Sequence, residues 1–549
     1  MKSTSKAQSR FSQIPSANIQ RSKFNRSHGH KTTFDAGLLI PIFVDEALPG
    51  DTFNLNATLF ARLATPLKPV MDNMFLDTWF FAVPNRLLWD NWQKFNGEQT
   101  NPGDSTDFLV PQLDSGTFAF GSIHDHFGLP TGIQIGGTIG LQVNALHHRA
   151  YNLIYNEWFR DQNLQDSVAV HTDDGPDPIS DYQLLRRGKR HDYFTSCLPW
   201  PQKGPAVELP IGGFAPVSFD VGAPEQFPVS GTGTPLFSAS NLTGTSPIQA
   251  QGLTASMKWN QSPSGGGTVR QDASWADPQL ETDLSAINLR ADLSSATATT
   301  INALRESFQI QRMFERDARG GTRYTEIIHS HFGVVSPDSR LQRPEYLGGG
   351  STPVNLTSVP QTTPDATTPQ GNLAAYGIAS SSGHSFNKSF TEHCVIVGLA
   401  CVRADLTYQK GLNRMWSRQT RFDFYWPALA HLGEQEVLNK EIYAQGAVAH
   451  QTDNATFGYQ ERYAEYRYKP SQVTGLFRSD HPQSLDVWHL SQDFTTLPTL
   501  SAQFIQEDPP IDRVIAVPSE PHFIMDLYFN LTCARPMPTY SVPGLIDHF

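Results

Sequence analysis

Cysteine is scarce in this sequence, which has four cysteines among 549 residues and no C-x-x-C pair. A disulfide framework or a zinc site requires closer or more regular spacing. The sequence therefore predicts four buried free thiols, at Cys197, Cys394, Cys401 and Cys533. Long apolar runs are missing too, because the longest, residues 394–402, is too short to cross a bilayer, and no secretory-type apolar stretch lies near the start. We expect a soluble protein made in a cytoplasm, without membrane insertion.

Catalytic motifs are absent as well: there is no P-loop, G-x-G-x-x-G, G-x-S-x-G or H-E-x-x-H pattern. The strongest metal candidate is His329 with His331, two residues apart in an expected strand, as at the start of a cupin metal site. The carboxylate that such a site supplies a few residues later is missing here, and also after His124 and His126. Structural histidines are the favoured interpretation. We expect no catalytic residue, no metal ligand and no cofactor.

Charged residues make up only 17% of the chain, whereas there are 41 glycines, 39 prolines and 11% aromatic residues. This composition favours long polar loops on an aromatic core. Strand-like patterns occur in 51–62, 74–83, 421–426 and 523–533, mostly as alternation with a period of two. Residues 394–402 are apolar throughout, as in a strand covered on both faces. Core strands this far apart in sequence favour an all-β sandwich or barrel.

Helical spacing is confined to a few stretches. Apolar residues three and four apart predict a helix over about 141–160, and shorter helices are expected around 88–95 and over 435–444. The other segments with weak strand patterning are long connections, which are usually functional or disordered.

Two of these connections stand out by composition, because Gly, Ser, Thr and Pro dominate them. Residues 205–303 are expected to form a surface insertion, and residues 348–383 a low-complexity loop. The expected organisation is an arm followed by one core domain in two parts, with these two excursions inside it. The boundaries are 1–34 for the arm and 35–204 and 304–549 for the core domain.

Positive charge is concentrated at the N-terminus. Seven cations precede the first acid, Asp35, and the remainder of the chain has a net charge of −19. A basic arm on an acidic body predicts contact with a polyanion at one end of the chain, with phenylalanines available to stack on bases. The alternatives are a solvated tail and an arm that threads to a neighbouring subunit. The candidate polyanion-contacting residues are Lys2, Lys6, Arg10, Phe11, Arg21, Lys23, Phe24, Arg26 and Lys31.

Two further clusters indicate contacts with partners. The first is a short basic cluster that fits a phosphate or, equally, a solvated or inter-subunit face: Arg186, Arg187, Lys189, Arg190 and His191. The second is rich in tyrosine and arginine, which are typical anchors of protein interfaces. Packing within the chain is the alternative for this second cluster. The candidate subunit-interface residues are Tyr459, Arg462, Tyr463, Tyr466, Arg467 and Tyr468.

Seven long stretches, in order along the chain, resemble the major capsid proteins of microviruses (Microviridae), especially the gokushovirus type (Gokushovirinae). These viruses are small bacteriophages with circular single-stranded DNA. The stretches begin in the arm and end at the C-terminus. They are FDAGLLIPIFVDEALPGDTF (34–53), AYNLIYNEWFRDQNLQ (150–165), KRHDYFTSCLPWPQKG (189–204), FERDARGGTRYTEIIHSHFGVVSPDSRLQRPEYLGG (314–349), PQGNLAAYG (369–377), FGYQERYAEYRYKPSQVTG (457–475) and RPMPTYSVPGLIDHF (535–549).

This resemblance implies a single viral jelly roll, with eight antiparallel strands in a barrel or sandwich, long loop insertions and a few helices. It implies self-assembly of about sixty copies into a T=1 icosahedral shell around circular single-stranded DNA. The implied partners are a small basic DNA-packaging protein, an internal scaffolding protein, a minor pilot protein and a host surface receptor. The receptor would be contacted by the 205–303 insertion, protruding near the threefold axes. We expect a virion component, assembled in the host bacterial cytoplasm.

Two other functions compete with a shell protein. A lectin-like adhesion module would explain the polar loops but not the basic arm. A jelly-roll metal enzyme would need a His/His/acid set that the sequence does not supply, so we expect no enzyme.

Sixty arms would neutralise only about a quarter of the phosphates in the smallest genome able to encode this chain. Further cations are therefore expected from ions, polyamines or the small basic partner.

Overall fold

The computed structural model describes residues 20–132, 140–205, 207, 217–219, 289–291, 301–334, 342–446 and 449–540. The chain divides into two units, Met1–Pro205 with Met313–Phe549, and Ala206–Arg312, and each is described by itself. Most of the expected insertion, 205–303, lies outside the described residues. Within the second unit, strands β6 (Val217–Phe219) and β7 (Leu289–Ala291) pair antiparallel, and helix α4 (Ile301–Arg319) begins.

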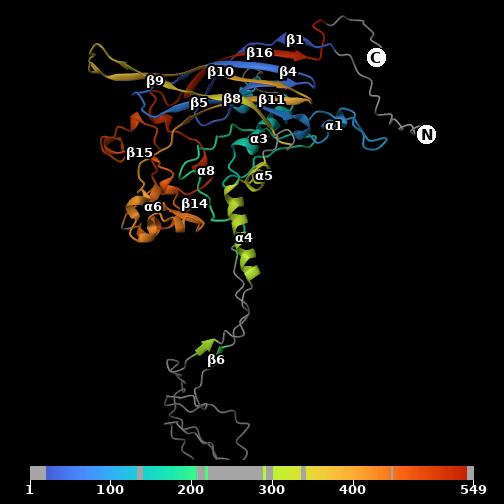
Figure 1. Cartoon of the computed structure of the whole chain (residues 1–549). Helices are drawn as coiled ribbons and strands as arrows, with labels where there is room; N and C mark the ends of the chain where they lie inside the picture. The colour runs from blue at the N-terminus through green and yellow to red at the C-terminus, as the bar shows by residue number, and fades with distance from the viewer. Residues whose placement is uncertain are drawn as a thin grey trace, which may run out of the picture. The chain divides into compact units, whose positions relative to one another are not determined.

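The first unit is built on two antiparallel sheets that pack face to face as a sandwich (Figure 1). The order in the six-stranded sheet is β1-β16-β4-β10-β9, with β2 also on β16, and the order in the four-stranded sheet is β3-β11-β5-β8. The strands of the first are β1 (Ser22–Asn25), β2 (His28–Phe34), β4 (Thr52–Leu63), β9 (Asn355–Pro360), β10 (Leu373–Ser389) and β16 (Phe523–Arg535). Those of the second are β3 (Ile40–Ala47), β5 (Met74–Pro84), β8 (Glu345–Pro353) and β11 (Cys394–Ala404).

This architecture confirms the expected fold class, a β-dominated sandwich of the jelly-roll kind with few helices. Strands far apart in sequence lie side by side, since β16 pairs with β4 and with both N-terminal strands. The two sheets together contain ten strands among the described residues, rather than the eight expected.

Strands β4 and β16 show why the sequence forms this sheet. Along β4 every second side chain is buried, from Phe53 to Leu63, and β16 repeats the pattern from Phe523 to Cys533. The register sets Leu59 opposite Leu527, so both apolar sets point into the sandwich. This period of two confirms the strands expected at 51–62 and 523–533.

Strand β11 is buried along both faces, as its uninterrupted apolar sequence predicts. Ile396 and Val402 face the core between the sheets, whereas Val397 and Leu399 face a second apolar cluster beyond the four-stranded sheet. Strand β5 lies beside β11 along its whole length, which confirms the strand expected at 74–83. All four cysteines are free and buried, as expected.

Helices form a layer against the free face of the four-stranded sheet (Figure 1). Helix α3 (Leu146–Ile154) packs on β11 and β5 and continues as a π turn over Tyr155–Phe159. It confirms the helix expected at 141–160, although it begins five residues later. The other short helices of this layer are α1 (Trp92–Phe95) and α2 (Ile123–His126).

A third apolar cluster organises much of residues 190–205 and 405–510. Its small elements are β12 (Thr407–Tyr408), β13 (Glu434–Leu438), α6 (Asn439–Ile442), α7 (His450–Asp453), β14 (Thr456–Glu461), β15 (Ser471–Gln472) and α8 (Ala502–Ile505). Helix α5 (Tyr324–Phe332) follows α4. Among the described helices, none is both long and apolar enough to span a membrane.

The N-terminal arm differs from expectation. Residues 22–34, expected to be part of a flexible basic arm, form β1 and β2 on the edge of the six-stranded sheet. Phe34 is buried and stacks on Phe523, with ring centres 5.5 Å apart. This packing explains why the positive charge of the segment did not keep it free. Residues 1–19 lie outside the described residues.

Residues 348–383, expected to be a low-complexity loop, instead supply much of β8, β9 and β10. Small side chains are needed there, because a Cβ at Gly350 would lie 2.5 Å from the ring of His384. The glycine-rich composition therefore reflects close packing between strands rather than an irregular loop.

Two shorter predictions are wrong. Residues 421–426, expected to form a strand, make a 3₁₀ turn over Arg421–Asp423 and remain exposed. Residues 435–444, expected to be helical, begin in β13, and only Asn439–Ile442 is helical. At 435–444 the pairing of β13 with β14 overrides the local helical spacing, whereas at 421–426 the alternating rings have no partner strand among the described residues and stay exposed.

Candidate subunit-interface and nucleic-acid contact sites

Exposed aromatic side chains gather where residues 414–432 meet residues 463–468. Phe422 is 65% exposed and Phe424 51%. The guanidinium of Arg418 lies 4.2 Å from the centre of the Tyr466 ring and 5.5 Å from that of Phe424. We call this set the aromatic–arginine cluster. It comprises Arg418, Arg421, Phe422, Phe424, Tyr425, Trp426, Tyr463 and Tyr466.

An ion pair and hydrogen bonds hold the cluster in a fixed conformation. Arg418 forms an ion pair with Glu465 at 3.2 Å, and both side chains are nearly buried. Tyr463 has a left-handed backbone conformation, with φ of 63°, which is strained for a bulky residue. Its hydroxyl donates to the carbonyl of Phe422 at 3.3 Å, and its amide donates to Gln435 at 3.2 Å. These bonds fix the two segments against each other.

A rigid, exposed group of rings and arginines is suited to binding another protein. Aromatic rings cover much area at a small cost in conformational entropy, and arginines above them add cation–π attraction. Monomeric proteins rarely leave a contiguous apolar patch of this kind in water. The cluster therefore has the composition and the rigidity of an interface.

The structure brings together some of the predicted interface residues and separates others. Tyr463 and Tyr466 belong to the cluster, and Tyr468 is 47% exposed beside it in sequence. Arg462 lies over the Tyr463 ring at 4.9 Å, and Arg467 pairs with Glu461. Tyr459 lies instead in β14, where its backbone pairs with Leu198.

Sequence reasoning missed six of the eight residues of this cluster, those from Arg418 to Trp426. Their alternation was interpreted as a half-buried strand. The signal that could have found them is Tyr425, an aromatic residue on the side of the supposed strand that should have been polar. A segment with rings on both sides and two flanking arginines is more typical of an interface than of a strand.

The described cations of the arm lie on the edge of the six-stranded sheet. Arg26 turns inward and pairs with Asp45. Arg21 donates to the backbone oxygen of Gly50 at 2.6 Å. Lys23 is exposed, whereas Lys31 pairs with Asp526 at 3.1 Å across the strand pair. Phe24 is half-buried, and Lys2, Lys6, Arg10 and Phe11 lie outside the described residues.

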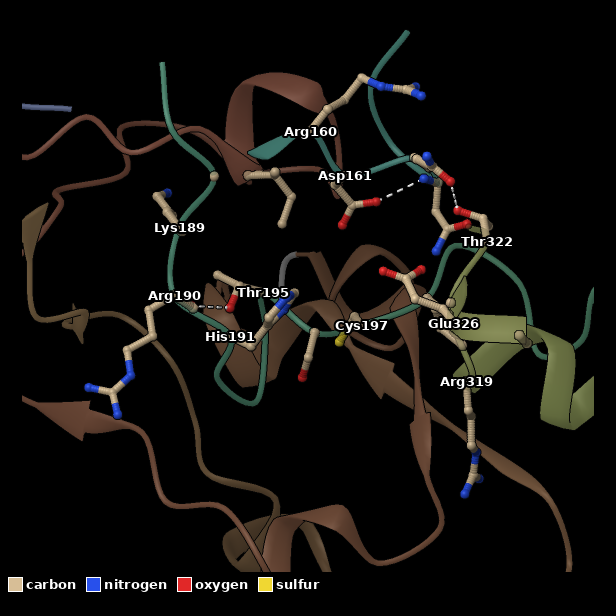
Figure 2. Close-up of a pocket in the computed structure, with 18 of the residues that line it drawn as sticks. Arg160, Asp161, Lys189, Arg190, His191, Thr195, Cys197, Arg319, Thr322 and Glu326 are labelled. Carbon is tan, nitrogen blue, oxygen red and sulfur yellow. Dashed lines mark hydrogen bonds between the residues drawn. The ribbon is translucent and has the colours of Figure 1, made fainter. Parts of the chain in front are cut away.

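The basic cluster borders a cavity of about 840 Å³ (Figure 2). Arg187 bonds to Asp77 at 2.5 Å, and Lys189 donates to Gln492 at 2.8 Å. Burial lowers the pKa of Lys189 to about 8. In Figure 2 the labelled arginines Arg160, Arg190 and Arg319 point in different directions, so their charges do not converge on one anion. This arrangement gives the phosphate interpretation no geometric support.

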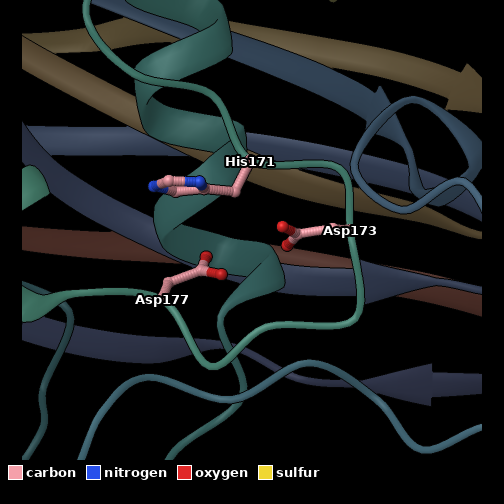
Figure 3. A group of neighbouring side chains, drawn as sticks. All are labelled: His171, Asp173 and Asp177. Carbon is pink, nitrogen blue, oxygen red and sulfur yellow. The ribbon is translucent and has the colours of Figure 1, made fainter.

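One group of side chains has the composition of a metal site: His171, Asp173 and Asp177 (Figure 3). Arg149 already supplies the positive charge there. Its Nη2 lies 2.5 Å from Oδ1 of Asp177 and 3.3 Å from Oδ1 of Asp173, and Nε donates to Asp177 at 2.7 Å. Arg149 and Tyr182 together hold the pKa of Asp177 below its usual value, although burial opposes them. A guanidinium in this position disfavours a metal ion.

The histidine pairs have structural partners. His329 and His331, expected in a strand, lie in helix α5, where His331 bonds to Asp317 at 2.6 Å. His124 bonds to His148 at 2.9 Å in a buried aromatic pocket, and burial lowers the pKa of His124 to about 4. Both rings of this pair are therefore neutral at physiological pH.

Comparisons with known proteins cover nearly the whole chain. Residues 12–545 match the model of a family described as Capsid protein (F protein). The chain is 51% identical to Capsid protein VP1 of Bdellovibrio phage phiMH2K, over 98% of each protein. It is 45% identical to Capsid protein VP1 of Chlamydia phage 1, over 98% of this chain and 97% of the relative.

A third relative, Capsid protein VP1 of Spiroplasma virus 4, is 40% identical over 97% of each protein. The match runs through both sheets, the helical layer and the third apolar cluster, so it concerns the whole architecture rather than one motif. The chain belongs to the phage capsid protein (F protein) family and is a viral structural protein of the microvirus, gokushovirus type.

Proposed function

We propose that this chain is the major capsid protein of its virus and that about sixty copies assemble into a T=1 icosahedral shell around circular single-stranded DNA. The observation that carries the proposal is the match at 51% identity along almost the full length of a capsid protein. A role as a shell component also accounts for a chain that offers no converging catalytic set among its described residues. We propose no enzymatic activity.

Self-association is proposed to use the aromatic–arginine cluster. Five of its six rings are exposed in the single chain, and the buried ring of Tyr463 helps to hold them in place before any partner binds. Such preorganised aromatic and arginine side chains contribute most of the energy in typical interfaces. A second copy of this chain is the occupant that a homo-oligomeric shell supplies.

Genome contact is proposed for the basic N-terminal segment. Lys23 is exposed, and the cations at positions 2, 6 and 10 precede it in the sequence. The segment cannot neutralise the genome alone, because the remainder of each chain is acidic. We therefore propose a small basic DNA-packaging protein as a further partner. An internal scaffolding protein and a minor pilot protein are proposed on the family resemblance.

Host attachment is proposed for the 205–303 insertion, protruding near the threefold axes. Its polar, glycine- and serine-rich sequence suits a solvated surface, and recognition often resides on loops carried by a rigid scaffold. Deleting about 225–285 should leave particles intact and abolish attachment to the host surface receptor. Loss of assembly in this deletion would show that the segment is structural.

Electron microscopy of the chain expressed with its viral partner genes tests the main proposal. We expect closed particles of uniform diameter that sediment as megadalton assemblies and protect single-stranded DNA from nuclease. An adhesion module would instead stop at small oligomers. Uniform empty shells would support assembly and contradict the proposed genome contact, so the two parts can be judged separately.

A further inference from the structure

One face of the six-stranded sheet is left uncovered by the described elements (Figure 1). The sheet's other face packs into the sandwich core. On the uncovered face, which we call the outer face, every second residue of β4 and β16 is largely exposed. Antiparallel register places directly opposed residues on the same face, so the composition of the outer face follows from the strand pairs.

The two sheets of the sandwich differ sharply in charge. The six strands of the first contain a single carboxylate, Asp526, against five cations, Lys23, Lys31, Arg62, Lys388 and Arg535. The four strands of the second contain four carboxylates, Asp45, Glu46, Asp77 and Glu345, against one cation, Arg403. The register places Lys23, Lys31 and Arg62 on the outer face with Asp526, whereas Lys388 pairs with Glu345 and Arg535 with Asp51 on the other side of the sheet. On a chain with a net charge of −12, the outer face therefore carries a small excess of positive charge.

The cations on the outer face are available for contacts. Lys23 and Arg62 are exposed and form no ion pair with the described part of the chain. Lys31 forms an ion pair with Asp526, and both side chains of this pair are exposed to solvent. Arg21 reaches the same surface at Thr52, to whose hydroxyl it donates at 3.1 Å. Positive charge thus lies at both ends of strand β4.

Two exposed aromatic rings lie on β4 and β16 of the outer face, and Tyr376 of β10 is a third exposed ring farther along this face. Phe60 is 46% exposed and Tyr528 is 54% exposed. Phe60 is opposite Asp526, and Tyr528 is opposite Thr58, so the two rings are diagonal neighbours on adjacent strands. Diagonal neighbours in a sheet are within reach of large side chains. Among the described residues, neither ring contacts another aromatic ring. The two rings therefore offer adjacent flat surfaces.

Around these rings the face is rich in amides. Asn530 is opposite Asn56, Asn54 is opposite Asn387, and Asn25 lies in the neighbouring row opposite Thr532. All five asparagines are exposed. Asparagine is disfavoured in strands, so five of them on adjacent rows need an explanation beyond folding. Amide groups can bond the donor and acceptor edges of nucleobases.

We propose that the outer face of the six-stranded sheet binds single-stranded DNA, with bases stacked on Phe60 and Tyr528 and phosphates held by Lys23 and Arg62. This inference rests on the proposed role as a genome-enclosing shell and identifies the surface that meets the genome. Cations, isolated rings and amides on one flat surface are the components of single-strand binding sheets. The large apolar side chains exposed along β4 and β16, Phe60, Ile524 and Tyr528, are interspersed with Arg62 and Asp526. The core of a protein interface is, by contrast, typically depleted of charged residues.

The first test asks, in assembled particles, whether DNA contact at positions 60 and 528 requires aromatic rings or only apolar volume. The double variant Phe60→Leu with Tyr528→Leu keeps apolar volume but removes both stacking surfaces, whereas Phe60→Tyr with Tyr528→Phe keeps the rings. Ultraviolet crosslinking of packaged DNA, followed by mass spectrometry, should recover nucleotides on peptides containing positions 60 and 528. We expect these crosslinks in the wild type and the ring-preserving variant and their loss in the leucine variant, with particles still forming.

The second test measures binding of an oligothymidylate probe to the purified full chain. The leucine pair should bind at least about tenfold more weakly, and the ring-preserving pair within about twofold of wild type. Lys23→Gln with Arg62→Gln should lower the slope of log affinity against log salt by about 0.7 for each lost phosphate contact. Lys469→Gln, which changes an exposed lysine outside these strands, should leave the slope unchanged.

Two results from assembled particles would overturn the inference. One is a particle structure in which a second copy of the chain covers the outer face. The other is wild-type particles that protect DNA but yield no crosslinks at positions 60 or 528. Assembly of both ring variants with unchanged probe binding would also contradict it. If the wild-type chain forms no shell with its partner genes, the proposed function fails instead, whatever the probe shows.

Discussion

At the scale of single residues, the most informative side chain is Arg149. It is fully buried, and it bonds to Asp177, to Asp173 and to the carbonyl of Leu88. Tyr182 adds a further bond to Asp177 at 2.5 Å. One guanidinium therefore joins helix α3 to the segment at Leu88 and to the segment that contains Asp173 and Asp177. No pattern in the sequence indicates this role, because an arginine in a helix is usually solvated.

Replacing Arg149 with methionine should destabilise the chain by about 3–5 kcal/mol, because Asp177 would remain buried without its partner. The lowered pKa of Asp177 in the wild type means that its stabilisation is present above its ordinary pKa and is lost as the pH falls through the lowered value. In the variant, burial alone should raise this pKa. Denaturant unfolding across pH should therefore show the largest gap at neutral pH and a smaller one in acid.

A matched control is available in the same group. Asp173 is 75% exposed at its side chain, so Asp173→Asn should cost less than about 1 kcal/mol. If Arg149→Met were tolerated equally well at neutral pH, the guanidinium would not be the support that its contacts indicate.

At the scale of secondary-structure elements, strand β8 shows how composition can mislead. Its Gly348–Gly349–Gly350 run was interpreted as loop, yet it lies between β5 and β10. A Cβ at Gly349 would collide with the carbonyl of Thr78 on β5. Period-two patterns were reliable in β4 and β16, where large side chains alternate. They were uninformative where close packing had removed the side chains altogether.

Gly349→Ala should therefore destabilise the sandwich by about 1–3 kcal/mol or more, because the clash is with backbone and cannot be relieved by a rotamer change. Gly383→Ala provides the control, since a Cβ there meets nothing within 4 Å. Thermal unfolding of the purified chain measures both. Equal melting temperatures for the two variants would contradict the packing described for β8.

The N-terminal arm shows a second limit of prediction from sequence at this scale. Charge counting identified the basic segment, but it could not reveal that the segment's last part pairs with β16, because strand partners distant in sequence leave no local signal. Deleting residues 1–19 should leave the unfolding of the chain unchanged and lower the DNA protected per particle. Deleting residues 1–34 should also remove Phe34, whose burial alone contributes about 1.5–3 kcal/mol, and should unfold or aggregate the chain.

The two truncations are compared by thermal unfolding and by nuclease-protected DNA per particle. Unchanged DNA in the shorter deletion would show that the described cations, rather than residues 1–19, make the basic contact. A stable fold in the longer deletion would contradict the role given to β2.

At the scale of the whole molecule, the sequence predicted the core of the fold better than it predicted the surfaces. The fold class, the family and the candidate interface near residue 463 followed from long-range patterns in the sequence. The remainder of the aromatic–arginine cluster and the basic outer face did not, because each depends on segments that meet only after folding. Arg418 and Tyr466 are 48 positions apart in sequence but in contact in the fold.

The aromatic–arginine cluster predicts a defect in assembly without a defect in folding. Tyr466→Ala and Phe422→Ala each remove an exposed ring and should cost about 1–2 kcal/mol per contact, repeated at every interface of the shell. The critical concentration for particle formation, measured by light scattering, should rise by tenfold or more. Thermal unfolding of the unassembled chain should change little.

Tyr540→Ala is the control, because this tyrosine is 85% exposed and lies outside the cluster. An equal rise in critical concentration for this variant would mean that the effect is not specific to the cluster. No rise for either cluster variant would remove the cluster from the interface.

The position of β16 has a consequence for how such a chain is made. This strand lies inside the six-stranded sheet, between β4 and the N-terminal strands, yet it is among the last segments synthesised. Ser27 and Asn530, which meet across this pairing, are 503 residues apart. At roughly 5–20 residues per second, the first strands wait tens of seconds on the ribosome for their partner. We expect a chain that stops before Phe523 to leave the core between its sheets open, because β4 would lack the partner strand that covers it. Incomplete subunits would then be unable to take part in assembly.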